Sequence, residues 1–158
     1  GCYFADYECS FGTRDDLSPN TIIYGHSDLT NNPDGPRFSE LFRFTEEDFA
    51  RSTPVITFAT QEDWMDWEVF AVAEYSTDPR LIQPEPEGGI AALAADVRKE
   101  SVFDYDVQVG DGDHILTLIT CTDEPSVRLV VMARLLDSDA ELPAAASIAS
   151  SDETSQEV

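Results

Sequence analysis

The stretch from Ile115 to Leu136, ILTLITCTDEPSVRLVVMARLL, decides the fold. Two apolar runs, Ile115–Thr120 and Val127–Leu136, flank a polar connection of six residues at most. Runs of β-branched and aliphatic residues of this length predict strands, and so short a connection predicts an antiparallel hairpin. Such a hairpin brings the end of its first strand next to the start of its second. We therefore expect Cys121 and Arg128 to face each other at the same end of the sheet.

Four other segments predict further strands. Thr21–Tyr24 and Val55–Thr60 are short β-branched runs that follow prolines. Trp67–Tyr75 is apolar on both faces, which is typical of a strand buried on two sides. Over Tyr105–Val109, apolar residues alternate with polar ones, as in a half-exposed strand.

Helical patterns are fewer. The best one covers Ile90–Glu100, where Ile90, Leu93, Ala94 and Val97 fall at helical spacing. Thr45–Asp48 has the pattern of a capped helix start. Many short strands and few helices predict a mainly β protein: a mixed, mostly antiparallel β-barrel with the 90–100 helix packed on it.

Length and charge narrow the possible functions. A chain of 158 residues is expected to form one domain. It carries 32 acidic and 9 basic residues, a formal net charge of −23. Such a chain lacks the basic surface that neutralises phosphates, which argues against nucleic acid and against direct docking on an anionic membrane. From Asp137 onward it has six carboxylates, many Ala and Ser, and no basic residue. This composition predicts a domain over 1–136 and a disordered acidic tail over 137–158.

The chain opens at Gly1, without a methionine, a signal segment or an apolar run long enough to span a bilayer. We therefore expect it to be an internal piece of a longer protein. It has three cysteines, and an odd number leaves at least one outside any disulfide within the chain. Cys2 and Cys9 could pair with each other in an oxidising compartment, but their spacing does not decide this.

Three side chains stand out for their chemistry. Cys121 follows one predicted strand, His26 follows another through Gly25, and Arg128 opens the partner strand of the hairpin. A thiol, an imidazole and a guanidinium are the nucleophile, the acid/base and the oxyanion donor that covalent acyl transfer needs. Each of them alone is more often an ordinary structural residue.

The sequence around these residues resembles class B sortases. Asn20–His26 (NTIIYGH) is similar to the family's catalytic-histidine segment, and Asp113–Cys121 (DHILTLITC) with Arg128–Val131 (RLVV) to its cysteine and arginine strands. Gly1–Tyr7 (GCYFADY) looks like the strand that precedes the histidine segment. The resemblance covers Gly1–Leu136 in the family's order. It implies a sortase-like β-barrel with a long helix before the penultimate strands, here without the family's first two strands and N-terminal helices.

The resemblance also implies a function. Cys121 would be the nucleophile, His26 the acid/base, Arg128 the oxyanion stabiliser and Thr120 a substrate-binding residue. Such enzymes cut a sorting-signal peptide after its Thr, hold the acyl part as a thioester and pass it to an amine of a peptidoglycan precursor or a pilin. They do so at the extracellular face of the cell membrane of Gram-positive bacteria, for wall anchoring or pilus assembly, and need no metal or cofactor.

Two alternatives stay open. The first is a catalytically inactive surface domain with a sortase-like fold. The second is a metal site, built either from His26, His114, Cys121 and some of the many acids or, for calcium, from Asp104, Asp106, Asp111 and Asp113. The chain has none of the usual zinc spacings, and these four acids match no EF-hand order. Thiol labelling at controlled pH separates the enzyme from the inactive domain, because a Cys121 thiol coupled to His26 should react and a buried one should not.

Overall fold

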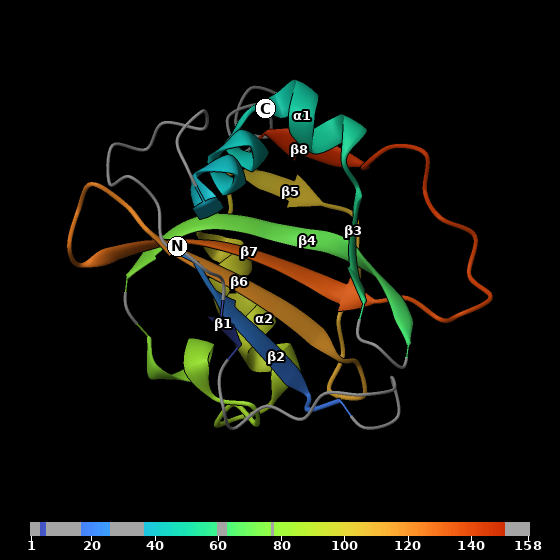
Figure 1. The fold of residues 1–158 in the computed structure, drawn as a ribbon, viewed down its shortest axis with the longest axis horizontal. Helices are drawn as coiled ribbons and strands as arrows, with labels where there is room; N and C mark the ends of the chain where they lie inside the picture. Colours follow the sequence, from blue (N-terminus) through green and yellow to red (C-terminus); the bar gives the residue numbers. More distant parts are fainter. Residues whose placement is uncertain (1–3, 6–16, 26–36, 60–62, 77, 151–158) are drawn as a thin grey trace, which may run out of the picture.

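The computed structural model describes residues 4–5, 17–25, 37–59, 63–76 and 78–150. A curled β-sheet forms the centre of the structure, and helices lie around it (Figure 1). The elements in chain order are β1 (Phe4–Ala5), β2 (Asn20–Tyr24), the 3₁₀ helix η2 (Arg37–Thr45), α1 (Glu47–Ser52), β3 (Val55–Ala59), β4 (Trp64–Ser76), the 3₁₀ helix η3 (Pro79–Ile82), α2 (Ile90–Lys99), β5 (Phe103–Tyr105), β6 (Ile115–Cys121), β7 (Val127–Leu135) and β8 (Ile148–Ser150).

The main sheet has six strands in the order β1-β2-β6-β7-β4-β3. Its β2–β6 pair is parallel and its other pairs are antiparallel. The sheet curls into a half-barrel (Figure 1). The prediction of a mixed, mostly antiparallel β fold is confirmed.

The predicted hairpin lies at the centre of this sheet. β6 and β7 pair from Ile115↔Arg134 to Cys121↔Arg128, and β4 flanks β7 on its other side. Residues 69–73 of β4 are all buried, as the two-faced apolar pattern predicts. The core therefore covers both faces of the central strands.

The predicted helix forms α2, whose apolar residues Ile90, Leu93, Ala94 and Val97 are buried. Its start lacks a local side-chain cap. Instead, Asp111 Oδ1 accepts a hydrogen bond of 2.9 Å from the Ala91 N–H. Gly89, at the N-cap, has a φ of 96°, and a Cβ there would lie 2.6 Å from Asp111 Oδ1. The helix start therefore requires a glycine at this position.

The prediction of a strand over 105–109 is wrong beyond its first residue: β5 covers Phe103–Tyr105, and residues 106–109 form no strand. The Arg98 guanidinium at the end of α2 donates to the carbonyls of Tyr105 and Val107. These carbonyls are acceptors that a longer strand would have offered to a neighbouring strand. The segment with the alternating pattern is therefore held by hydrogen bonds from the Arg98 side chain.

Part of the acidic segment after Asp137 has regular structure, although the composition of the segment predicts disorder. Residues 148–150 form β8, which pairs with β5, and Ile148 is 8% exposed. The Asp106 N–H donates to the Ser147 carbonyl (2.9 Å) and the Ala146 N–H to the Arg51 carbonyl (2.8 Å). A single buried isoleucine and an available strand edge order this part of the segment, an effect that overall composition does not register.

Cys2 and Cys9 lie outside the described residues. Within the described part of the chain, no helix is long and apolar enough to cross a membrane.

Candidate active site

Three neighbouring strands begin or end at the same end of the main sheet. Cys121 ends β6 and is paired across the hairpin with Arg128, near the start of β7. β2 runs parallel to β6, so both strands end at this edge, and the Gly25 N–H donates to the Ile119 carbonyl at 3.1 Å. The sequence predicts that Cys121 and Arg128 lie at one end of the sheet, and the register places them there.

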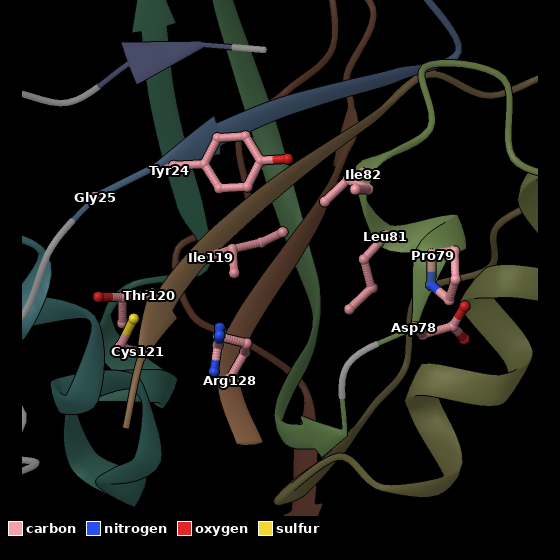
Figure 2. A pocket seen from close by; sticks show the side chains of 10 residues that line it. All are labelled: Tyr24, Gly25, Asp78, Pro79, Leu81, Ile82, Ile119, Thr120, Cys121 and Arg128. Carbon is pink, nitrogen blue, oxygen red and sulfur yellow. The ribbon is translucent and has the colours of Figure 1, made fainter. Parts of the chain in front are cut away.

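A pocket of about 520 Å³ opens at this edge. Figure 2 shows Cys121 and Arg128 on neighbouring strand ends, with Leu81 and Ile82 across the pocket from them. The pocket is lined by Tyr24, Gly25, Asp78, Pro79, Leu81, Ile82, Ile119, Thr120, Cys121 and Arg128. Its walls are mostly apolar, and its polar groups gather at the strand ends. This is the usual composition of a site that binds an organic ligand and orients it with a few polar contacts.

The two residues at the end of β6 differ in exposure. Cys121 is half-buried, whereas Thr120 is only 2% exposed. Among the described residues, the Thr120 hydroxyl has no hydrogen-bond partner although it lines the pocket. The hydroxyl oxygen itself is buried, and Figure 2 shows it pointing away from Arg128 and Leu81.

The Arg128 guanidinium is held by the turn that joins β6 and β7. Its Nη1 donates to the carbonyls of Pro125 (2.8 Å) and Val127 (3.1 Å). Among the described residues, no group accepts a hydrogen bond from its Nε or Nη2. A guanidinium fixed in this way is a preoriented donor for an oxyanion.

The wall opposite Cys121 comes from η3 and the residue before it, which the sequence analysis did not identify. Asp78 caps η3 by accepting from the Arg80 N–H at 2.9 Å, and Pro79 occupies the first helical position. Leu81 is 2% exposed and Ile82 is 47% exposed. Asp followed by Pro is a recognisable helix-start signal, but only tertiary packing places this turn on the pocket.

An ionic cluster lies directly behind this wall. Hydrogen bonds from the Arg80 guanidinium lower the pKa values of the Asp78 and Asp96 carboxyls. Burial, and to a lesser extent the negative charge of Asp78, raise the pKa of Tyr75. Both carboxylates are therefore charged at neutral pH, and the cluster stays intact there.

The two histidines lie in different situations. His26 follows Gly25 in the sequence and falls outside the described residues. His114 precedes β6, at the end of the strand opposite Cys121, and its Nδ1 lies 3.1 Å from the Ser18 carbonyl oxygen. The structure does not bring His114 and Cys121 together as the metal-site alternative requires. Among the described residues, no group of three or more His, Cys, Asp or Glu side chains is placed to hold a metal ion.

A half-barrel sheet whose central hairpin ends in a cysteine opposite an arginine is the arrangement that the resemblance to class B sortases implies. The chain belongs to the sortase family, because the sequence profile of the sortase domain matches residues 12–136.

Individual relatives agree with this assignment. Sortase B of Listeria monocytogenes is 33% identical in an alignment of 141 positions that covers 86% of this chain. Sortase B of Staphylococcus aureus is 28% identical in an alignment of 125 positions that covers 76% of it. The solved Listeria sortase B has a TM-score of 0.68 at 32% identity and aligns over 85% of this chain and 72% of its own. A sortase B solved in complex with triglycine has a TM-score of 0.72 at 26% identity, over 88% of this chain and 64% of its own. The predicted relationship to class B sortases is confirmed.

The chain spans about half the length of the curated relatives it matches, 54% of the Listeria protein and 50% of the Staphylococcus protein.

Proposed function

We propose that this chain carries the catalytic core of a sortase-type cysteine transpeptidase, over residues 1–136. The enzyme would cleave a sorting-signal peptide after its Thr through a thioester on Cys121, and transfer the acyl part to an amine. The observation that carries the proposal is the Cys121↔Arg128 pair at the mouth of the 520 Å³ pocket. This pair offers a nucleophile and an oxyanion donor from adjacent strand ends to one ligand.

The thiolate is the nucleophilic form of a cysteine, and nearby cations favour it. We assign that role to Arg128 and to a protonated His26. Their positive charges would lie on the side of the pocket where Cys121 ends its strand.

Acylation requires only the side chains of Cys121, Arg128 and His26. The Cys121 thiolate attacks the carbonyl carbon of the substrate Thr, a C–S bond forms, and the carbonyl oxygen becomes negative. Nε and Nη2 of Arg128 donate to that oxygen. When the intermediate collapses, the C–N bond breaks and His26 gives its proton to the departing amine.

Transfer reverses the same chemistry. The acceptor amine attacks the thioester carbonyl and gives a proton to His26. The C–S bond then breaks, Cys121 leaves as the thiolate, and a new amide remains. We assign Thr120, which lines the pocket, to the residues that bind the donor peptide. These steps require no metal and no cofactor.

The relatives support a peptide donor and an amine acceptor. One relative was solved as a Staphylococcus aureus sortase B–substrate complex, and another sortase B with triglycine. For this chain we propose the same classes of partner: a sorting-signal peptide, and an amine of a peptidoglycan precursor or a pilin. The site of action would be the outer face of the cell membrane of a Gram-positive bacterium.

Trapping the acyl-enzyme tests the proposal. The full-length protein is incubated with a library of short peptides that each contain one fixed Thr, and its intact mass is recorded. We expect a mass increase equal to the peptide portion that ends at Thr, its discharge by added triglycine, and no increase in Cys121→Ala. A chain that never gains this mass, and whose Cys121 alkylates no faster than a solvent-exposed model thiol, would be the inactive surface domain instead.

A further inference from the structure

Segment 78–84 forms the pocket wall opposite Cys121 with very little regular structure. Its only helix is η3, four residues of 3₁₀ helix. So short a helix does not hold its shape by its own hydrogen bonds. The position of the wall must therefore come from contacts with the rest of the protein.

The first contact is Asn20 at the start of β2. This side chain is fully buried, and its Nδ2 donates to the carbonyls of Leu81 (3.3 Å) and Gln83 (3.1 Å). Its Oδ1 accepts from the Thr117 hydroxyl at 2.6 Å, which fixes the amide on the neighbouring strand. Its backbone N–H also donates to the Pro84 carbonyl at 2.9 Å. One residue of the main sheet thus holds three carbonyls of the segment.

The second contact is Arg80, within η3 itself. Its Nη2 lies 2.8 Å from Asp78 Oδ2 and 2.9 Å from Asp96 Oδ2. Asp96 belongs to α2, whose apolar face is buried. Arg80 therefore ties the start of the wall to a helix that is anchored independently.

The two contacts bracket the residues that face the pocket. Leu81 and Ile82 line it, whereas Asn20 and Arg80 are not among its lining residues. Figure 2 shows the Leu81 and Ile82 side chains on the opposite side of the pocket from Cys121. Neither side chain can therefore touch a peptide in the pocket directly: Arg80 can act on it through the wall, and Asn20 through the wall or through Thr117 on β6.

We propose that Asn20 and Arg80 are positioning residues that hold segment 78–84 as a preformed wall, and that this wall sets the affinity for the apolar part of the donor peptide. The inference rests on the proposed function, because it names the part of the peptide that the same pocket selects. A preformed surface binds more tightly than a mobile one, since no ordering cost is incurred on binding. Losing either contact should weaken peptide binding and leave the chemistry at Cys121 intact.

Peptide binding and chemistry are measured separately to test this. Binding of the best fluorescein-labelled member of the Thr-containing library is titrated by anisotropy in a Cys121→Ala background of the full-length protein. This measurement does not depend on turnover, so it stands even if the proposed function fails. Alkylation of Cys121 by a small thiol reagent, and kcat and KM for acyl transfer, are measured in the same variants with the cysteine intact.

We expect Asn20→Ala to raise Kd and KM about tenfold, because both side-chain hydrogen bonds to the wall are lost together with the one accepted from Thr117. Arg80→Gln should raise both about threefold, and Arg80→Lys should restore part of the loss. The alkylation rate and kcat should stay within about twofold of the unaltered protein. Arg51→Gln is the matched control: it removes a comparable ion pair, to Glu47 on α1, away from the pocket, and should change nothing.

The inference is overturned if folded Asn20→Ala and Arg80→Gln bind the peptide as tightly as the unaltered protein. It is also overturned if kcat and the alkylation rate fall together with affinity, because the two residues would then be general structural supports. Should Asn20→Ala fail to fold, the partly exposed Arg80 variants decide the question. An unaltered protein that binds the peptide but forms no acyl-enzyme refutes the proposed chemistry and leaves the role of the wall to be judged from Kd.

Discussion

The pocket has one side made of strand ends and one side made of a single 3₁₀ turn, and their backbones are held in different ways. On the first side, β6 pairs with β7 along its whole length up to Cys121, and with β2 as far as Ile119. On the second side, segment 78–84 is held by hydrogen bonds from Asn20 and by the ion pair between its own Arg80 and Asp96 of α2. Substitutions on the strand side should therefore affect chemistry, and those on the turn side should affect fit.

The histidines give the largest expected effect on the strand side. His26→Ala should lower turnover by a factor of about 10² to 10⁴, the usual contribution of a general acid/base, while peptide affinity stays within twofold. His114→Ala should change turnover little, because His114 lies at the opposite end of β6 from Cys121. Single-turnover acylation rates of the two variants provide the measurement. An essential His114 with a dispensable His26 would contradict the assigned acid/base.

Arg128→Lys should follow in size. Lysine keeps the charge but loses the forked donor geometry, and one oxyanion donor is worth about two to three orders of magnitude in kcat. Arg134→Lys is the matched control at the other end of β7, where the guanidinium binds the Gln108 carbonyl and Glu68. It should retain turnover within about twofold. Equal losses in the two variants would mean that Arg128 acts only through folding.

Gly89→Ala tests the support behind the turn side. The residue has a positive φ, and its new Cβ would collide with the Asp111 carboxylate that caps α2. We expect a loss of about 1–3 kcal/mol in the free energy of unfolding, measured by urea denaturation. Gly112→Ala should cost little, because nothing lies within 4 Å of its Cβ position. If Gly89→Ala leaves stability unchanged, the α2 start is more adaptable than its contacts indicate.

The smallest effect concerns pH. Hydrogen bonds from Arg80 lower the folded-state pKa values of Asp78 and Asp96 below their ordinary 3.8. A lowered carboxyl pKa contributes stability that is present above the unfolded-state value and is lost as the pH falls through the folded-state value. The Tm difference between the unaltered protein and Arg80→Gln should therefore be largest near neutral pH and vanish at strongly acidic pH. A difference that stays constant from pH 7 down to pH 2.5 would assign it to packing of the arginine stem.

The strand side of the pocket was predictable from the sequence because its information is local. Apolar periodicity defined β6, β7 and α2, and a short connection placed Cys121 opposite Arg128. The turn side was not predictable, because its contacts join residues about 60 positions apart, such as Asn20 and Leu81. The periodicity of apolar residues along the sequence does not predict such a contact.

Two smaller differences have the same cause. The predicted cap at Thr45 is absent, since its hydroxyl donates to the Phe42 carbonyl at 2.6 Å and so closes η2 instead of opening α1. β8 forms because Ile148 is buried and residues 148–150 pair with β5. The acidic composition of the segment does not predict this pairing. Both outcomes were decided by which acceptor or edge lay nearby in space.

The parallel pairing of β2 with β6 has a consequence for how the molecule folds. About 95 residues separate the paired positions Asn20 and Ile115, whereas β6 and β7 are joined by a tight turn. Closing so long a loop lowers chain entropy before its contacts can compensate, and contacts distant in sequence slow folding. The hairpin with Cys121 and Arg128 can therefore form early, while the edge beside Gly25 must wait for the long closure. A folding chain would thus present its thiol well before it completes the site that uses it.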